Sequence, residues 1–232
     1  FKFDSAWDQA IAYTWSSSGR WMLPAQYWQV RVYYSGFSVD YFFLDSNVWD
    51  ALPPLVDPRH NICNSIHNDE TTTCGPEGPT SLDDCVGWFQ RLWDSQATWF
   101  DAGLARSDSE WQVVVTHFPP TWGTEFWMDM APRHGIDLII AGHVHNLQFH
   151  YMEEANFLKP TAWIISGGGG GITSEGVPSR SGHDNQYGFI ELTMTNGEIE
   201  VKGISHGGVE AFHGYVKQRP ASEMSPAAAP AR

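Results

Sequence analysis

Two short apolar runs that lead into histidines constrain the fold of this chain more than any other feature. The first, in "WQVVVTHFPP", predicts a fully buried strand over Gln112 to Thr116, and His117 follows it. The second, "IDLIIAGHVHN", predicts a strand that ends at Gly142, with His143 and His145 next. A short helical segment near "EFWMDMAPRHG" separates the two runs. Strand, helix, strand is typical of a layered α/β fold, in which ligands bind at the carboxyl ends of the strands.

The other segments predict one domain built around these strands. We expect two adjacent strands joined across Ser35 to Phe37, a helix capped by Ser81 and Asp84, and a hairpin that turns at Asn196-Gly197. The first twenty residues favour irregular to helical structure, and "TAWIISGGGGG" favours a strand that runs into a five-glycine loop. The helix before Gly135 contains Pro132, which we expect to kink or shorten it.

Composition sets the domain limits and excludes some partners. A length of 232 residues, with 42% hydrophobic content, fits one globular domain over residues 1–216. Residues 47–79 are rich in turn-forming types and predict a long loop or insertion, and residues 217–232 form a low-complexity tail. The net charge of −14 argues against nucleic acid or an anionic membrane as a partner. A phosphorylated substrate would need a local positive centre, and a bound metal would supply one.

The three cysteines bear on the compartment. Cys63, Cys74 and Cys85 fall in one segment without the paired short spacings of a zinc ribbon. We expect a disulfide between two of them, formed in an oxidising compartment, although three unpaired thiols in a loop stay an alternative. No apolar run approaches the length of about 20 residues that a membrane span requires.

The histidines at the two strand ends are candidate metal ligands. A neutral imidazole binds zinc, iron or manganese well and needs a rigid support that fixes the orientation of its ring. Gly142 would allow a sharp exit from its strand, and two prolines would stiffen the loop after His117. The spacing of His143 and His145 lets the pair reach two adjacent metals or share one. We interpret the remaining histidines as surface or loop residues (His60, His67, His134, His150, His183 and His213) or as structural (His206).

A resemblance to a known family rests on an ordered set of motifs. "VVVTHFPP" and "IIAGHVHNLQFH" are similar to the last two motif blocks of the calcineurin-like metallophosphoesterases. The chain most resembles the small, tartrate-resistant purple acid phosphatases, through "IAYTWSSSGRWMLPAQYWQV", "FFLDS", "SQATWF" and "ISGGGG" in the same order. The resemblance extends roughly from Ala10 to Val216. It implies a four-layer α/β sandwich of two mixed sheets flanked by helices, of which this chain is the C-terminal half with most of the second sheet.

The resemblance also implies a ligand set and leaves part of it outside this sequence. His117 and His143 would bind a divalent metal and His145 an iron-type metal, so that the cofactors would be iron plus zinc, manganese or a second iron. Asn146 would bond the adjacent loop or contact substrate. The bridging aspartate and the "GDxxY" and "GNHD/E" blocks of the family do not occur here. We therefore expect the proton-donating histidine, and an N-terminal half, upstream of Phe1.

Two functions follow as expectations. The first is hydrolysis of phosphate monoesters, on a small molecule or a phosphoprotein, at a two-metal centre completed by the missing N-terminal half. The second is a non-catalytic subunit that serves as a scaffold or interaction module in a larger assembly. The family and the cysteines favour a secreted, luminal or cell-surface location.

Overall fold

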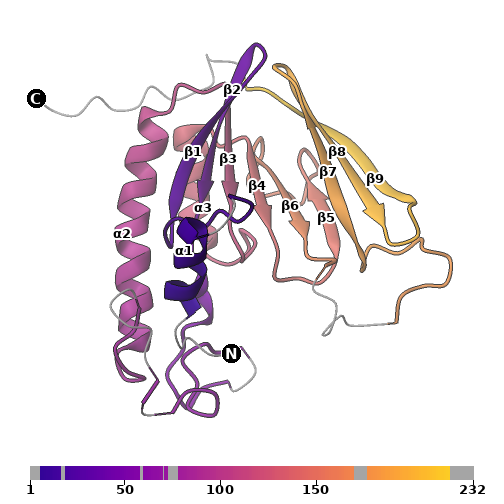
Figure 1. The fold of residues 1–232 in the computed structure, drawn as a ribbon. Helices are drawn as coiled ribbons and strands as arrows, with labels where there is room; N and C mark the ends of the chain where they lie inside the picture. Colours follow the sequence, from indigo (N-terminus) through magenta and orange to yellow (C-terminus); the bar gives the residue numbers. More distant parts are fainter. Residues whose placement is uncertain are drawn as a thin grey trace, which may run out of the picture. The chain divides into compact units, whose positions relative to one another are not determined.

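The computed structural model describes residues 6–16, 19–57, 60–69, 71–72, 78–169 and 177–219 (Figure 1). The chain divides into two compact units, one formed by Phe1–Trp28 with Leu44–Phe100 and the other by Gln29–Phe43 with Asp101–Arg232. Cys74 and residues 220–232 of the expected tail lie outside the described residues, and Lys217, the first residue of that tail, belongs to a strand. Among the residues described, no helix has the length and apolar character needed to cross a bilayer.

The second unit is built on a six-stranded mixed sheet in the order β1-β2-β3-β4-β6-β5 (Figure 1). Strands β2, β3, β4 and β6 run parallel, and β5 pairs antiparallel with β6 at one edge. The strands are β1 (Trp28–Tyr34), β2 (Phe37–Phe43), β3 (Trp111–Val115), β4 (Leu138–Ala141), β5 (Leu147–His150) and β6 (Ala162–Ser166). The expected α/β fold is confirmed, with two sheets.

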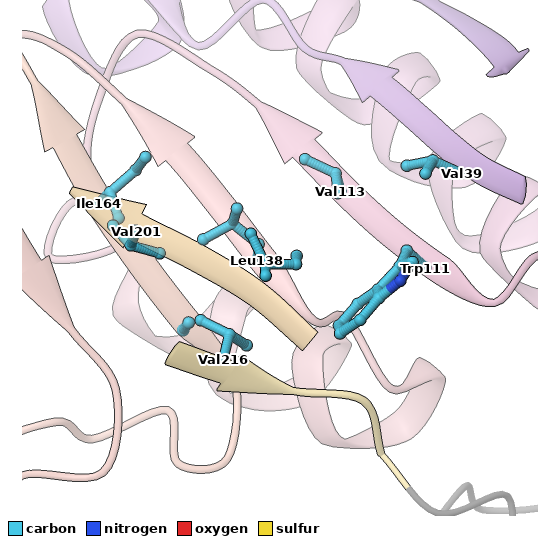
Figure 2. Close-up of a cluster of buried hydrophobic side chains, with 9 residues drawn as sticks. Val39, Trp111, Val113, Leu138, Ile164, Val201 and Val216 are labelled. Atoms are coloured by element: carbon cyan, nitrogen blue, oxygen red, sulfur yellow. The ribbon is translucent and has the colours of Figure 1, made fainter. Parts of the chain in front are cut away.

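A three-stranded antiparallel sheet packs on the first sheet within the same unit. It consists of β7 (Gly188–Met194), β8 (Glu198–Ser205) and β9 (Glu210–Lys217), and β7 and β8 form the expected hairpin. Figure 2 shows the core between the sheets, where Leu138 and Ile164 of the first sheet face Val201 and Val216 of the second. Burial of these aliphatic side chains, with fully buried Trp111, holds the two sheets together.

Helix α3 (Thr124–His134) connects β3 to β4 and so sets the spacing of the two strand ends that carry histidine. It ends where Gly135 adopts a left-handed conformation, with φ of 74°, and its amide donates to the Ala131 carbonyl. Pro132 lies inside the last turn of the helix, so the helix continues past this residue instead of stopping before it.

A buried acid lies where this connection enters β4. Asp137 accepts a 2.8 Å hydrogen bond from the Gln112 amide, and Arg219 Nε lies 3.9 Å from its other oxygen. Burial raises the pKa of Asp137 to about 7, against the opposing effects of the Gln112 amide and the Arg219 charge. The carboxyl is therefore a neutral acid in the folded protein at acidic pH.

The first unit contains the expected long loop and a second, smaller core. Besides the 3-10 helix η1 (Asn47–Asp50), the described residues between 47 and 79 form no helix or strand. Cys63 and Cys85 form a disulfide and are buried with Phe89 and Ala51, which confirms that two of the three cysteines pair. Asn61 folds the loop around itself, because its carboxamide bonds the backbone of four other residues (Leu52, Pro53, Val56 and Cys63).

The remaining helices are α1 (Ala6–Ser16) and α2 (Cys85–Arg106). Ser81 Oγ accepts a 3.2 Å bond from the Asp84 amide just before α2, as the sequence predicts for a helix start. Within the first unit, Gln96 of α2 holds the loop that begins at Leu44, because its side chain bonds both the amide and the carbonyl of Asp45. Asp45 thus belongs to a contact between this loop and α2.

Candidate metal centre

The carboxyl ends of β3 and β4 lie side by side and carry the candidate ligands. The two strands are parallel, with Val115 opposite Ile140. The pairing continues past the strands, since the Gly142 amide donates a 3.0 Å bond to the His117 carbonyl. His117 and the loop from His143 to Asn146 therefore leave one edge of the sheet together, as the sequence predicts.

The rings of His117 and His143 are in contact. Their centroids lie 5.3 Å apart at an interplanar angle of 80°. Two aromatic rings fix the His143 ring from other directions, Phe118 at 4.3 Å and Trp122 at 4.8 Å between centroids. Such packing restricts the imidazole to a narrow range of orientations, which a metal ligand requires.

The backbone at His143 is strained. Its φ is 65°, in the left-handed region that residues other than glycine avoid at a cost of about 1–2 kcal/mol. Gly142 has no such φ, and a Cβ there would meet the His117 ring at an ordinary 3.7 Å. The expectation that Gly142 supplies the sharp exit is therefore wrong: His143 makes the turn. Unfavourable backbone geometry of this kind concentrates at functional sites.

His145 acts on His117 through its charge. Desolvation by the surrounding protein lowers the pKa of His117, although part of the residue reaches solvent. The electrostatic effect of His145 lowers this pKa further. Both effects favour the neutral imidazole, which is the form that binds a metal.

A glycine at the end of β6 lets its backbone press against the histidine loop. The Gly167 amide donates a 3.0 Å bond to the Asn146 carbonyl, and a Cβ on Gly167 would lie 1.8 Å from the Val144 carbonyl oxygen. Only glycine fits at this distance. The expected role of the glycine run, a close backbone approach to the site, is thus confirmed at Gly167; its end, from Gly170 on, lies outside the described residues.

Asn146 forms hydrogen bonds with two residues close to it in the sequence, one in β5 and one in the histidine loop. Its side-chain oxygen accepts a 2.9 Å bond from Gln148 Nε2, and its backbone amide donates to the Val144 carbonyl at 2.8 Å. These bonds fit the expected role of Asn146 as a residue that orders the loop.

The donor set fits a metal in its chemistry but is not a complete site. Within the described ranges, no three side chains of the His, Cys, Asp and Glu types converge closely enough to hold a metal ion. The sheet brings His117 and His143 together, and His145 lies within electrostatic range of His117. Neutral nitrogen donors of this kind suit zinc, iron or manganese, and further ligands would have to complete the coordination.

Sequence reasoning missed the aromatic support of His143 and placed two histidines wrongly. Phe118 and Trp122 flank the strand end, and their position next to a histidine-bearing loop was the available signal. His134, expected at the surface or in a loop, is buried in α3, and its Nε2 lies 2.6 Å from Asp101 Oδ1. His150, also assigned to the surface, is half-buried and stacks on Trp163.

The family comparison agrees with this geometry. The calcineurin-like phosphoesterase family matches residues 28–147, which include both strand ends and all three histidines. This match covers just over half of the 232 residues, and the chain belongs to that family.

Comparison with solved structures finds distant similarities. Purple acid phosphatase PPD1 from yellow lupin (Lupinus luteus) seeds is 14% identical, with a TM-score of 0.49 over 88% of this chain and 36% of that one. PhoD is 13% identical, with a TM-score of 0.41 over 87% and 42%. A Vps29 mutant from Entamoeba histolytica is 18% identical, with a TM-score of 0.24 over 41% and 47%. The chain spans about a third of the length of PPD1. No curated protein matches it.

Proposed function

We propose that this chain is part of a metal-dependent phosphoesterase that hydrolyses phosphate monoesters at a two-metal centre. One observation carries the proposal: the neighbouring ends of β3 and β4 bring the His117 and His143 rings to 5.3 Å, inside the region that matches the family. The family implies divalent metal ions, and we propose iron with zinc, manganese or a second iron.

In this proposal each residue of the chain has a defined task. His117 and His143 hold one metal, His145 holds the other, and Phe118 with Trp122 keeps the His143 ring in place. Asn146 lies next to His145 and contacts an oxygen of the phosphate group. The metals, when bound, would draw negative charge from the phosphate oxygens and supply hydroxide near neutral pH. Carboxylate ligands and the proton donor come from an N-terminal half that precedes this sequence.

Metal analysis of single-residue variants tests the proposal. In the full-length protein, we expect His117→Ala and His143→Ala each to lower bound metal below one ion per chain and to reduce p-nitrophenyl phosphate turnover at least about 100-fold. His213→Ala is the matched control, because His213 lies on β9, where its Nε2 is 2.9 Å from Glu200 Oε1 and its Nδ1 is 3.6 Å from Glu210 Oε1. Unchanged metal content in both site variants would refute the ligand assignment.

A non-catalytic scaffold is the second candidate. The absence of a three-donor group among the described residues favours it, as do the exposed aromatic side chains, with Tyr33 77% and Trp15 75% exposed. Such a subunit would bind less than one metal per chain and show no turnover even with its natural partners retained, so the same measurements separate the two functions.

We also propose an oxidising location: secreted, luminal or at the cell surface. The Cys63–Cys85 disulfide supports it, because structural disulfides persist mainly in such compartments. Alkylation of the native protein before and after reduction tests this proposal, and two cysteines protected only before reduction are the expected result.

A further inference from the structure

A line of hydrogen-bonded side chains runs along β5 away from the candidate metal centre. Gln148 and His150 of β5 lie on one face of the strand, and Asn146 immediately precedes the strand at the same two-residue spacing. Gln148 Nε2 donates to Asn146 Oδ1 at 2.9 Å, and Gln148 Oε1 lies 3.0 Å from His150 Nε2. His150 Nδ1 lies 2.7 Å from Glu153 Oε1. A continuous line of hydrogen bonds therefore joins the Glu153 carboxylate to Asn146, the residue that follows His145.

The ring of His150 lies between two hydrogen-bond acceptors and an indole face. Both ring nitrogens face acceptors, the Gln148 amide oxygen and the Glu153 carboxylate, and only an imidazolium can donate to both. The ring stacks on Trp163 at 3.8 Å between centroids and 18°, where an indole face attracts a cation. Partial burial acts to raise the pKa of Glu153, but bonds from the Tyr151 amide and from His150 outweigh it and lower that pKa.

Neutral surroundings complete the environment of this ring. In the described part of the chain, Glu153 is the titratable group in contact with His150, and β6 contributes neutral Trp163. The second sheet meets β5 on its other face, where Phe149 stacks with Phe212 and with Tyr151. Glu153 is thus the charged group that the His150 ring contacts.

We propose that Gln148 and His150 are positioning residues that determine which end of the Asn146 carboxamide is turned toward a bound phosphate. This inference rests on the proposed function, in which Asn146 contacts the phosphate group. With His150 protonated, Gln148 occupies the Asn146 oxygen, and the Asn146 NH2 group is left to donate to a phosphate oxygen.

Loss of the proton from His150 Nε2 reverses the direction of the hydrogen bonds between His150, Gln148 and Asn146. The Glu153 carboxylate keeps the remaining proton on Nδ1, so Nε2 becomes an acceptor. The Gln148 carboxamide then turns over to donate to Nε2, and its oxygen takes a bond from the Asn146 NH2 group. A carboxamide rotated by 180° keeps its shape and exchanges donor for acceptor, so both settings pack equally well. Asn146 now presents its oxygen to the phosphate and repels it. Phosphate is therefore bound preferentially while both ring nitrogens of His150 carry protons.

Side-chain amide NMR of the full-length protein without phosphate tests the relay directly. Between pH 4.5 and 8, we expect the Asn146 NH2 signals to change with the same midpoint as the His150 ring. The change should disappear in His150→Phe, which keeps a ring against Trp163 but has no nitrogen. Thermal unfolding of the variant checks that it folds. Asn146 signals that do not follow the His150 titration would overturn the relay whether or not the protein is a phosphatase.

Steady-state kinetics with p-nitrophenyl phosphate tests the consequence. Loss of one hydrogen bond to a charged oxygen weakens binding by roughly 10- to 100-fold, so KM should rise by about that factor from pH 5 to 7.5 with a smaller change in kcat. Glu153→Gln should reduce the rise to about twofold or less, because the new carboxamide can donate to Nδ1 and leave the Nε2 proton pointing at Gln148. Equal KM profiles in wild type and Glu153→Gln would refute the link to substrate. A wild type without turnover or phosphate binding would instead remove the proposed function, and the NMR result would stand apart from it.

Discussion

A methyl group added at Gly167 should displace the loop from His143 to Asn146, because it would clash with the backbone of Val144. The new Cβ would lie 1.8 Å from the Val144 carbonyl oxygen and 2.8 Å from its carbon, and both neighbours are backbone atoms that cannot rotate away. Restoring a contact of about 3.4 Å requires a shift of about 1.6 Å between β6 and the loop. Functional groups tolerate about 0.5 Å, so His143 and His145 would leave their positions. We expect Gly167→Ala to weaken metal binding about 10- to 100-fold and to lower stability by about 1–3 kcal/mol.

Gly169→Ala is the matched control for this substitution. It adds the same methyl group two residues further on, where a Cβ would have nothing within 4 Å. Zinc affinity of the full-length protein, measured by competition with a chromophoric chelator, should fall for Gly167→Ala and stay within about twofold of wild type for Gly169→Ala. Equal zinc affinity in the two variants would refute the close packing of Gly167 on the ligand loop.

Three further predictions concern stability. Replacing Cys63 and Cys85 together by alanine removes a cross-link between residues 22 positions apart and should lower the unfolding free energy by about 3 kcal/mol in urea titrations; no change would mean that the bond is not formed. Asp137 has a folded pKa of about 7 against 3.8 for the unfolded carboxyl, so the folded state binds the extra proton between these values and stability falls as pH rises through that window. From pH 5 to 7 the loss should be roughly 2–3 kcal/mol and should be absent in Asp137→Asn, as urea titrations at both pH values can check. Arg31→Met leaves the fully buried Asp40 without its 2.7 Å partner and should cost about 3 kcal/mol or more at pH 7 but less at pH 3, where a protonated Asp40 no longer needs the partner.

The placement of His117 beside His143 could be predicted from the sequence because it follows from strand pairing. Two apolar runs linked by a short helix predict parallel neighbours, and parallel neighbours present their carboxyl ends at one edge. The register of Val115 opposite Ile140 then brings the residues that follow them together. Periodicity, turn chemistry and connection length were enough for this part of the fold.

Other features depend on tertiary packing, which a single sequence does not reveal. β5 and β9 were missed because β5 is only four residues long, β9 is interrupted by Gly214, and neither has a long apolar run. The turn at His143 was assigned to Gly142 because glycine is the usual residue there, whereas contacts from Phe118 and Trp122 stabilise the strained histidine. The choice of disulfide partners among three cysteines likewise depends on which two the loop brings together.

Anomalous diffraction from crystals of the full-length protein grown with zinc or iron tests the central claim most directly. The account predicts a metal peak about 2.0–2.2 Å from an imidazole nitrogen of both His117 and His143, with His145 bound to the same metal or to a second metal beside it. A metal held elsewhere in the protein, with the three rings unligated, would contradict it.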